Sequence, residues 1–266
     1  EAAVAAQGTA LINIEVETGL NRLGVPLRAL PSLLQRIQRA QRSAMLVGIS
    51  THLSSAEDVA SQHIVDTQFA ALEEARALCH TYGIEVPFVH AANSAATIFA
   101  RHVQGTMVRA GIALYGLWPS RDIKIAVQRG RACELTPVLS WKARIAQVKD
   151  VPAGGGIGYD RTFIANRPMR IAVLPVGYYD GFDRGLSNGG KVLVHGRPCP
   201  VVGRVCMNMA MVDVSAIAQV KPDDVATIIG REGIGTVSAE EIAEKLATIN
   251  YEVVTRISAH LPRVVV

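Results

Sequence analysis

Short apolar runs alternate with helix-like patterns over the first 115 residues. Short strands are expected at residues 11–16, 44–49, 86–90 and 111–115. The run at 44–49 is continuously apolar, as in a strand that is covered on both faces. The segments between the expected strands place apolar residues at helical spacing. The expected helices cover Pro31–Arg42, a stretch from a capping box at Ser54 and Glu57 to Gly83, and a stretch that begins at Asn93 and Ser94. This alternation predicts an α/β fold with a parallel sheet under helical cover.

The pattern changes after Trp118. Residues 119–135 combine Pro119 with several charged residues and predict a linker. Beyond it short strands dominate, and we expect them at 139–151, 170–176, 191–195, 200–207, 210–214 and 224–229. One helix is expected over Ser238–Ile249, where Ser238 and Glu241 form a capping box. Residues 136–266 therefore predict a small β-domain, built as a barrel or a sandwich.

Two folds fit the strand and helix units of the first half. A (β/α)8 barrel needs eight strands and about 250 residues, whereas only about half of that length precedes Gly116. Either the sheet is open and doubly wound, or the chain lacks the beginning of a barrel. The Ala-rich start at Glu1 favours the second interpretation. We expect residues 1–118 to be the C-terminal half of a TIM-type barrel, followed by the all-β domain.

Composition narrows the class of protein. The chain has 266 residues, 49% of them hydrophobic, and a formal net charge of +4. Because its Lys and Arg residues are scattered, no basic patch indicates a nucleic-acid partner. No apolar run reaches the roughly 18 residues of a membrane span, so we expect a cytoplasmic protein without a membrane partner. The four cysteines lack CxxC spacing and predict neither a disulfide framework nor a metal site.

Polar residues gather where the predicted strands end. In parallel barrels the functional groups sit at these carboxyl ends, and the candidates are Arg22, His52, His90, Asn93, Ser94 and Arg109. Taken singly, each has a structural interpretation, such as a helix cap for Ser94. Together, two guanidinium groups and a helix N-terminus predict an anion site.

A glycine-rich stretch in the second half surrounds one tyrosine. Gly154–Gly158 precedes Tyr159, and the stretch ends at Phe163, between two predicted strands. Dense glycines indicate unusual backbone conformations or close approach of another group. Loops held by a rigid scaffold are common sites of chemistry, so Tyr159 is a candidate functional residue. By itself, the stretch is more typical of a structural hairpin loop than of a functional site.

Six ordered blocks extend the pattern along the whole chain. They are Glu17-Thr18-Gly19-Leu20-Asn21-Arg22-Leu23-Gly24, His90-Ala91-Ala92-Asn93-Ser94-Ala95-Ala96, Arg109-Ala110-Gly111-Ile112-Ala113-Leu114-Tyr115-Gly116, Gly158-Tyr159-Asp160, Gly177-Tyr178-Tyr179-Asp180-Gly181 and Gly203-Arg204-Val205-Cys206-Met207-Asn208. With them the chain resembles the alanine racemases, which have an N-terminal (β/α)8 barrel and a C-terminal β-domain. The resemblance implies a pyridoxal 5'-phosphate enzyme that interconverts L- and D-alanine, the latter for cell-wall synthesis.

The resemblance implies a role for each candidate on the cofactor side. Ser94 and the backbone of Gly111 and Ile112 would cradle the phosphate, with His90 and Asn93 beside it. Arg109 would face the pyridine nitrogen and, having no proton to spare, keep it neutral. His52 would support Arg109 from behind.

Substrate and partner roles follow from the same resemblance. Racemisation needs two opposed acid/base groups, and Tyr159 would be one of them, contributed to the partner's site in a homodimer with shared active sites. Arg22 and the backbone of Met207 would hold the substrate carboxylate. Tyr178 would line the entrance from the partner subunit.

The chain departs from the family pattern at four points. The Schiff-base lysine, the other acid/base, belongs to the first barrel strand, whereas every lysine of this chain lies at residue 124 or later. We expect it in a missing N-terminal half-barrel, so that the isolated chain is inactive. Ala259 replaces a tyrosine that narrows the pocket, and Asn208 replaces an aspartate. Glu15 replaces a lysine whose carbamate orients the carboxylate-binding arginine, so we expect Glu15 to pair with Arg22.

Two other functions stay open on the sequence alone. Ala259 favours a racemase of relaxed specificity that accepts serine or larger amino acids. If the chain is the whole gene product, the absent lysine favours a non-catalytic cofactor-binding or dimerisation module.

Overall fold

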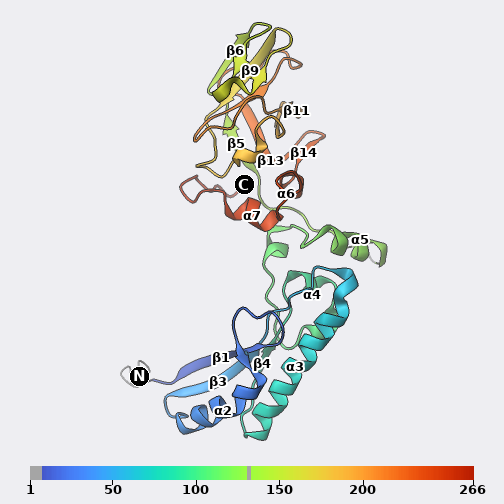
Figure 1. Ribbon diagram of the computed structural model, residues 1–266, viewed down its shortest axis with the longest axis vertical. Helices are drawn as coiled ribbons and strands as arrows, with labels where there is room; N and C mark the ends of the chain where they lie inside the picture. Colours follow the sequence, from blue (N-terminus) through green and yellow to red (C-terminus); the bar gives the residue numbers. More distant parts are fainter. Residues whose placement is uncertain (1–7, 131–132) are drawn as a thin grey trace. The chain divides into compact units, whose positions relative to one another are not determined.

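The computed structural model describes residues 8–130 and 133–266. Two compact units divide the chain, one within residues 1–136 and the other formed by Pro137–Val266. Each unit has its own arrangement of helices and strands (Figure 1). None of the helices formed by the described residues combines the length and apolar character that a membrane crossing requires.

The first unit is built on a parallel sheet. Its strands are β1 (Ala10–Glu17), β2 (Val25–Pro26), β3 (Ala44–Ser50) and β4 (Phe88–His90), in the order β2-β1-β3-β4. The α-helices are α2 (Leu30–Arg39), α3 (Gln62–Thr81), α4 (Ser94–Ile98) and α5 (Arg121–Gly130), the last within the segment expected to be a linker. Short 3-10 turns are η1 (Leu27–Ala29), η2 (Val59–Ser61), η3 (Arg101–Val103) and η4 (Ile112–Tyr115). The strands predicted at 11–16, 44–49 and 86–90 are confirmed.

Two local predictions for this unit are wrong. The apolar run 111–115 forms η4 rather than a strand, because the amide of Gly111 donates to the Ser94 hydroxyl and not to a strand. The long helix does not start from a capping box at Ser54. It begins at Gln62 after η2, whose N-cap is Asp58, while the Ser54 amide donates to the side chain of Gln68.

The two faces of this sheet have different surroundings. Ile14, Leu46 and Val89 belong to a core that includes buried residues of α2 and α3. On the other face large apolar side chains are exposed: Leu11 at 65%, Met45 at 51% and Phe88 at 48%. A parallel sheet is normally covered on both faces, so this face is the unusual one.

The second unit consists mainly of antiparallel strands. One sheet has the order β11-β10-β13-β14, with β5 also paired to β13, and another has the order β12-β9-β6. The strands are β5 (Trp141–Arg144), β6 (Gln147–Val151), β7 (Gly156–Ile157), β8 (Phe163–Ile164), β9 (Met169–Leu174), β10 (Lys191–Val194), β11 (Arg197–Pro200), β12 (Ala210–Asp213), β13 (Val225–Glu232) and β14 (Gly235–Val237). Its helical segments are η5 (Tyr159–Arg161), η6 (Arg184–Leu186), α6 (Ala239–Lys245) and α7 (Asn250–Thr255).

Most strands expected in this unit are confirmed, with two corrections. The run 139–151 is divided into β5 and β6. The strand predicted at 200–207 is largely a loop, since the amides of Gly203 and Val205 donate to the side chains of Asn188 and Ser187 instead of to a neighbouring strand. The cap predicted at Ser238 is present, with its hydroxyl accepting from the amide of Glu241 at 3.1 Å.

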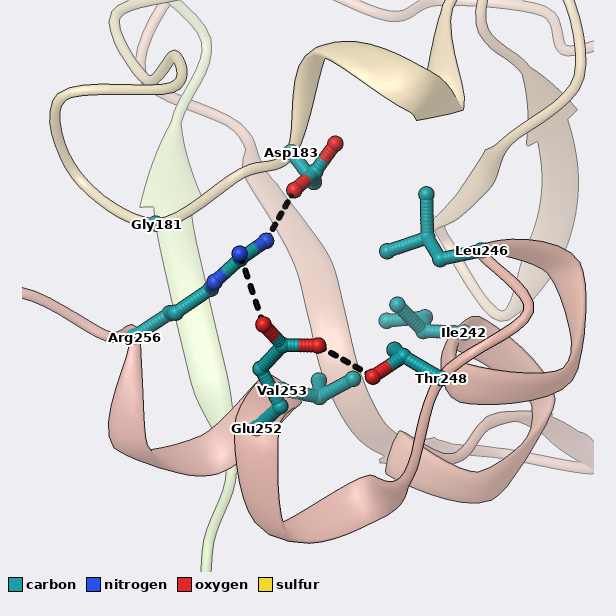
Figure 2. Close-up of a pocket in the computed structure, with 8 residues that line it drawn as sticks. All are labelled: Gly181, Asp183, Ile242, Leu246, Thr248, Glu252, Val253 and Arg256. Atoms are coloured by element: carbon teal, nitrogen blue, oxygen red, sulfur yellow. Dashed lines mark hydrogen bonds and ion pairs between the residues drawn. The ribbon is translucent and has the colours of Figure 1, made fainter.

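Helix α7 is tied to the turn that precedes η6. Figure 2 shows Arg256 between Glu252 and Asp183, with its guanidinium 2.7 Å from the former and 2.6 Å from the latter carboxylate. The Thr248 hydroxyl donates to the second oxygen of Glu252. Gly181 must be a glycine because an added Cβ would lie 2.4 Å from the carbonyl oxygen of Arg256. These contacts fix the segment that follows α7 against the turn around residue 180.

Candidate active site

Arg109 is held by the carboxyl ends of β3 and β4. Its Nη2 donates to the carbonyl oxygens of Thr51 at 2.7 Å and Ala91 at 3.3 Å, and its Nη1 donates to the carbonyl of His90 at 3.0 Å and to the imidazole Nδ1 of His90. Burial lowers the pKa of Arg109, and the charge of Glu15 acts in the opposite direction. Of its five N–H groups four are thus committed, and the described residues offer no hydrogen-bond acceptor to the fifth, on Nε.

Two histidines of this unit, His52 and His90, stand in different relations to Arg109. His90 contacts the guanidinium directly. Among the described residues, no hydrogen bond joins His52 to Arg109, although the resemblance led us to expect His52 to support it. Burial lowers the pKa of His52, and the charges of Arg22 and Arg109 lower it further. Burial likewise lowers the pKa of His90, again assisted by Arg109. Both rings are therefore held in the neutral form by burial and by neighbouring cations.

Ser94 accepts two backbone N–H groups of the third block. Its hydroxyl oxygen receives the amide of Gly111 at 2.8 Å and that of Ala113 at 3.2 Å. The helix cap is Asn93, whose side chain accepts from the amide of Ala96 at 3.0 Å. The helix-capping role that the sequence suggested for Ser94 is thus filled by Asn93. Because the Gly111 and Ala113 amides occupy the lone pairs of its oxygen, the Ser94 hydroxyl keeps its proton to donate to an anionic oxygen.

The loops that bear Arg22 and His52 are joined by a residue that sequence reasoning missed. Gln68 of α3 is buried; its side-chain amide donates to the His52 carbonyl and the Thr18 hydroxyl at 3.2 Å each, and its oxygen accepts from the amide and hydroxyl of Ser54. Its position in the apolar stripe of α3, three residues after buried Val65 and four before buried Leu72, is the signal that identifies it.

The expected pair of Glu15 with Arg22 is not formed in this structure. Among the described residues no ion pair joins the two side chains, and Arg22 is exposed. The carboxylate of Glu15 instead acts through its charge on Arg109, His52 and His90, whose pKa values it raises against the larger effect of burial. Glu15, Ser50 and His90 are neighbours in register at the carboxyl ends of β1, β3 and β4.

Tyr159 of the second unit projects from a braced loop. It is 69% exposed and lines a groove of about 620 Å³ together with Asn208, Cys206 and Met209. Its neighbour Asp160 lies 2.9 Å from the Nε of Arg204, close enough for an ion pair although the N–H does not point at the oxygen. Gly158, at φ 74°, allows the loop to approach the backbone of Arg204, where a Cβ would have only 3.0 Å.

Tyr178 and Met207 are brought together by two backbone hydrogen bonds between their segments. The amides of Tyr178 and Tyr179 donate to the carbonyls of Cys206 and Met207 at 3.0 and 2.9 Å. Gly177 makes this approach possible, because an added Cβ would lie 2.2 Å from the Cys206 oxygen. The predicted site residues of this unit therefore share one face of loops.

The segment around Ala259 is fixed on the same turn. Buried Asp180 accepts from the amide of Gly177 at 2.9 Å and lies 3.1 Å from the Nε2 of His260. The ring of His260 stacks on Tyr179 at 5.2 Å, and the amide of Ser258 donates to the carbonyl of Asp180. Ala259 thus sits between two anchored residues, one of which, His260, stacks on Tyr179.

Comparison of this sequence with known proteins identifies the family to which the chain belongs. The model of the alanine racemase N-terminal domain matches residues 1–119, and the model of the alanine racemase C-terminal domain matches residues 138–265. An alanine racemase of Carboxydothermus hydrogenoformans is 37% identical over 263 residues, which cover 97% of this chain and 68% of that protein. This chain belongs to the alanine racemase family. Members of the family depend on pyridoxal 5'-phosphate.

Other alanine racemases agree in sequence and in structure. The enzyme of Leptospira interrogans is 39% identical over 257 residues, 96% of this chain and 66% of its own length. The crystal structure of alanine racemase from a D-cycloserine-producing Streptomyces lavendulae has a TM-score of 0.90 at 32% identity and covers 99% of this chain and 68% of that one. The chain thus spans about two thirds of the length of the alanine racemases it matches.

Two features of the first unit suit pyridoxal phosphate. An uncommitted N–H on Arg109 is the donor that a neutral pyridine nitrogen, an acceptor, requires. The Ser94 hydroxyl, whose oxygen accepts the Gly111 and Ala113 amides, can donate its proton to a phosphate oxygen. In the part of the chain that the structure describes, no three His, Cys, Asp or Glu side chains form a metal-binding group.

Proposed function

We propose that this chain supplies the cofactor-binding face and the partner-directed tyrosine of a racemase that interconverts L- and D-alanine. The observation that carries the proposal is the arrangement of Arg109, whose four terminal N–H groups are bound by protein acceptors while Nε–H is left for a ligand. A guanidinium in this state can donate a hydrogen bond but has no proton to transfer. It therefore suits a ring nitrogen that must stay unprotonated.

Each residue of the site then has one task. Pyridoxal phosphate, when bound, withdraws electrons from the substrate Cα and so acidifies its proton. The Ser94 hydroxyl and the backbone of Gly111 and Ile112 hold the phosphate, with His90 and Asn93 fixing the elements around it. Arg22 and the backbone amide of Met207 bind the substrate carboxylate. Tyr159 accepts the Cα proton on one face as the phenolate in one direction, and in the other direction it donates its proton to Cα as the phenol.

Homodimerisation follows from the proposed role of Tyr159. Tyr159, Tyr178 and Met207 belong to the second unit, and Tyr159 is exposed beside an open groove. We propose that they serve the active site of the partner subunit, so that each site is shared. A variant that cannot dimerise then lacks an acid/base on one face of the substrate.

The lysine that bonds the cofactor is proposed to lie outside this chain. Residues 1–123 contain no lysine, and the chain spans about two thirds of its relatives. The uncovered sheet face with Leu11, Met45 and Phe88 supports a partial barrel whose remaining strands cover it. The isolated chain is then inactive, and the lysine-bearing part of the fold must be joined to it.

Substitution of Tyr159 tests the proposal. In the chain joined to a lysine-bearing racemase segment, Tyr159→Phe should lower racemisation in both directions by about 10²–10⁴-fold, the usual contribution of an acid/base group, while cofactor binding is retained. Tyr82→Phe at the end of α3 is the matched control and should keep full activity. Turnover of Tyr159→Phe within a factor of two of the parent would exclude this role.

Ala259 supports a second candidate, a racemase of relaxed specificity. It lies between Ser258 and His260, which both contact Asp180, and its side chain is smaller than the tyrosine usual in the family at this position. Serine and 2-aminobutyrate should then be racemised at rates comparable to alanine, and Ala259→Tyr should narrow the preference to alanine. A parent that already discriminates as sharply as Ala259→Tyr would rule this candidate out.

A further inference from the structure

A chain of hydrogen bonds crosses the open face of the sheet in the first unit. It runs from Arg109 to the Nδ1 of His90, from the Nε2 of His90 to the Oδ1 of Asn13 at 3.2 Å, and from the Nδ2 of Asn13 to the Ser50 hydroxyl at 2.9 Å. The residues lie on or just after three different strands, β4, β1 and β3. Asn13 and His90 are 77 positions apart in the sequence.

The donors and acceptors in this chain can be assigned from Arg109 alone. A guanidinium only donates, so the Nδ1 of His90 must be the unprotonated nitrogen. His90 is therefore neutral and carries its proton on Nε2, which needs an acceptor. Asn13 must then present its oxygen to His90 and its NH2 to Ser50, as found. One asparagine thus selects the only tautomer of His90 that can accept from Arg109.

Gly48 provides the space that this contact needs. It lies beside Asn13 in the register of β1 and β3. A Cβ at this position would be 2.5 Å from the Oδ1 of Asn13 and 3.2 Å from the carbonyl oxygen of Phe88. Since strand β3 is paired on both sides, its backbone cannot retreat. Any larger residue at 48 pushes the Asn13 side chain away from His90.

We propose that Asn13 is a positioning residue: by fixing His90 as the neutral Nε2–H tautomer across the gap at Gly48, it orients the guanidinium of Arg109. The catalytic consequence rests on the proposed function, because it requires Arg109 to face the cofactor. The structural consequence does not, because the tautomer is a property of the chain by itself. Ser50 is the last residue in the series of hydrogen bonds, so its substitution should have the smallest effect on the tautomer of His90.

Nitrogen NMR of selectively labelled histidine tests the structural part on the 266-residue chain. His90, assigned by loss of its signals in His90→Gln, should show a protonated Nε2 and an unprotonated Nδ1. Asn13→Leu removes the acceptor of the Nε2 proton, and Gly48→Ala displaces the Asn13 side chain from His90. Each variant should therefore give a mixture of the two His90 tautomers. Ser50→Ala should keep the parent pattern. A parent His90 protonated on Nδ1, or an unchanged tautomer in both Asn13→Leu and Gly48→Ala, overturns the proposal.

Kinetics of the chain joined to a lysine-bearing segment test the catalytic part. Asn13→Leu and Gly48→Ala should lower kcat about tenfold, the low end of the effect of outer hydrogen-bond partners, with KM for alanine unchanged because Arg22 lies elsewhere. A changed KM with unchanged kcat overturns the link to Arg109. If the parent shows the Nε2–H tautomer but no racemisation, the proposed function fails while the positioning of His90 stands.

Discussion

Gln68 should be one of the most sensitive polar positions in the first unit. Its side chain makes four hydrogen bonds, to the carbonyl of His52, the hydroxyl of Thr18, and the amide and hydroxyl of Ser54. It thereby joins the loop after β1 to the loop after β3. Gln68→Leu keeps the size of the side chain and the apolar packing on α3 but removes all four bonds.

The cost follows from which partners can recover water. A net intramolecular hydrogen bond is worth about 0.5–1.5 kcal/mol, and a buried group left unpaired costs about 1–3 kcal/mol. Ser54 is exposed and Thr18 is partly exposed, so their hydroxyls regain water, while the groups covered by α3 do so poorly. We expect Gln68→Leu to lower the free energy of unfolding by about 3 kcal/mol, or about 10 °C in Tm for a unit of this size.

Denaturant titration of the full chain and hydrogen exchange at the Ser54 amide measure the effect globally and locally. Gln35→Leu, the same change on the exposed side of α2, is the matched control and should stay within about 0.5 kcal/mol of the parent. Exchange at Ser54 should accelerate in Gln68→Leu alone. A loss of less than about 1 kcal/mol together with unchanged exchange would refute the reasoning.

Three further outcomes are expected. The pKa values of His52 and His90 are lowered, so the stability that these residues contribute is present above about pH 6.5 and is lost as pH falls through their folded-state pKa values. Denaturant titrations at several pH values should show the free energy of unfolding falling with pH in this range. A His52→Gln/His90→Gln variant that keeps the same pH dependence contradicts the assignment. Gly177→Ala should cost about 3 kcal/mol, since its methyl meets a carbonyl oxygen at 2.2 Å. Gly154→Ala, with nothing within 4 Å but a positive φ, should cost only about 1 kcal/mol by the same titration, and equal losses would be inconsistent with this. Arg256→Gln should cost at most about 1 kcal/mol, with the loss shrinking in 1 M salt, because the ion pairs in Figure 2 are partly exposed; a salt-independent loss argues against an electrostatic origin.

The sequence predicted the fold correctly where a local pattern of residues is compatible with only one type of secondary structure. Runs of strand length that are rich in apolar residues gave β1, β3 and β4. The run at 111–115 did not, because an apolar run is compatible with either a strand or a tight helix and the contact of Gly111 with Ser94 decides between them. The cap expected at Ser54 failed because a tertiary partner, Gln68, takes its amide.

The same limit applies to the site. Arg109, Ser94 and His90 were found because they lie in motifs at strand ends, where function is expected. Asn13 was not, since its role depends on a partner 77 residues away and on a gap at Gly48. The pairing of Glu15 with Arg22 was inferred from their spacing in sequence, but the turn that follows β1 leaves Arg22 exposed. Contacts across strands are set by register, which a local pattern does not contain.

The most direct test of the account is the conversion of L-alanine to D-alanine by two samples, each supplied with pyridoxal phosphate. One is the 266-residue chain alone, and the other is the same chain joined to a racemase segment that carries the cofactor-binding lysine. We expect no D-alanine from the first sample and equilibration of the two enantiomers by the second. Turnover by the chain alone, or none after the segment is joined and shown by spectroscopy to bind the cofactor, would contradict the proposed function.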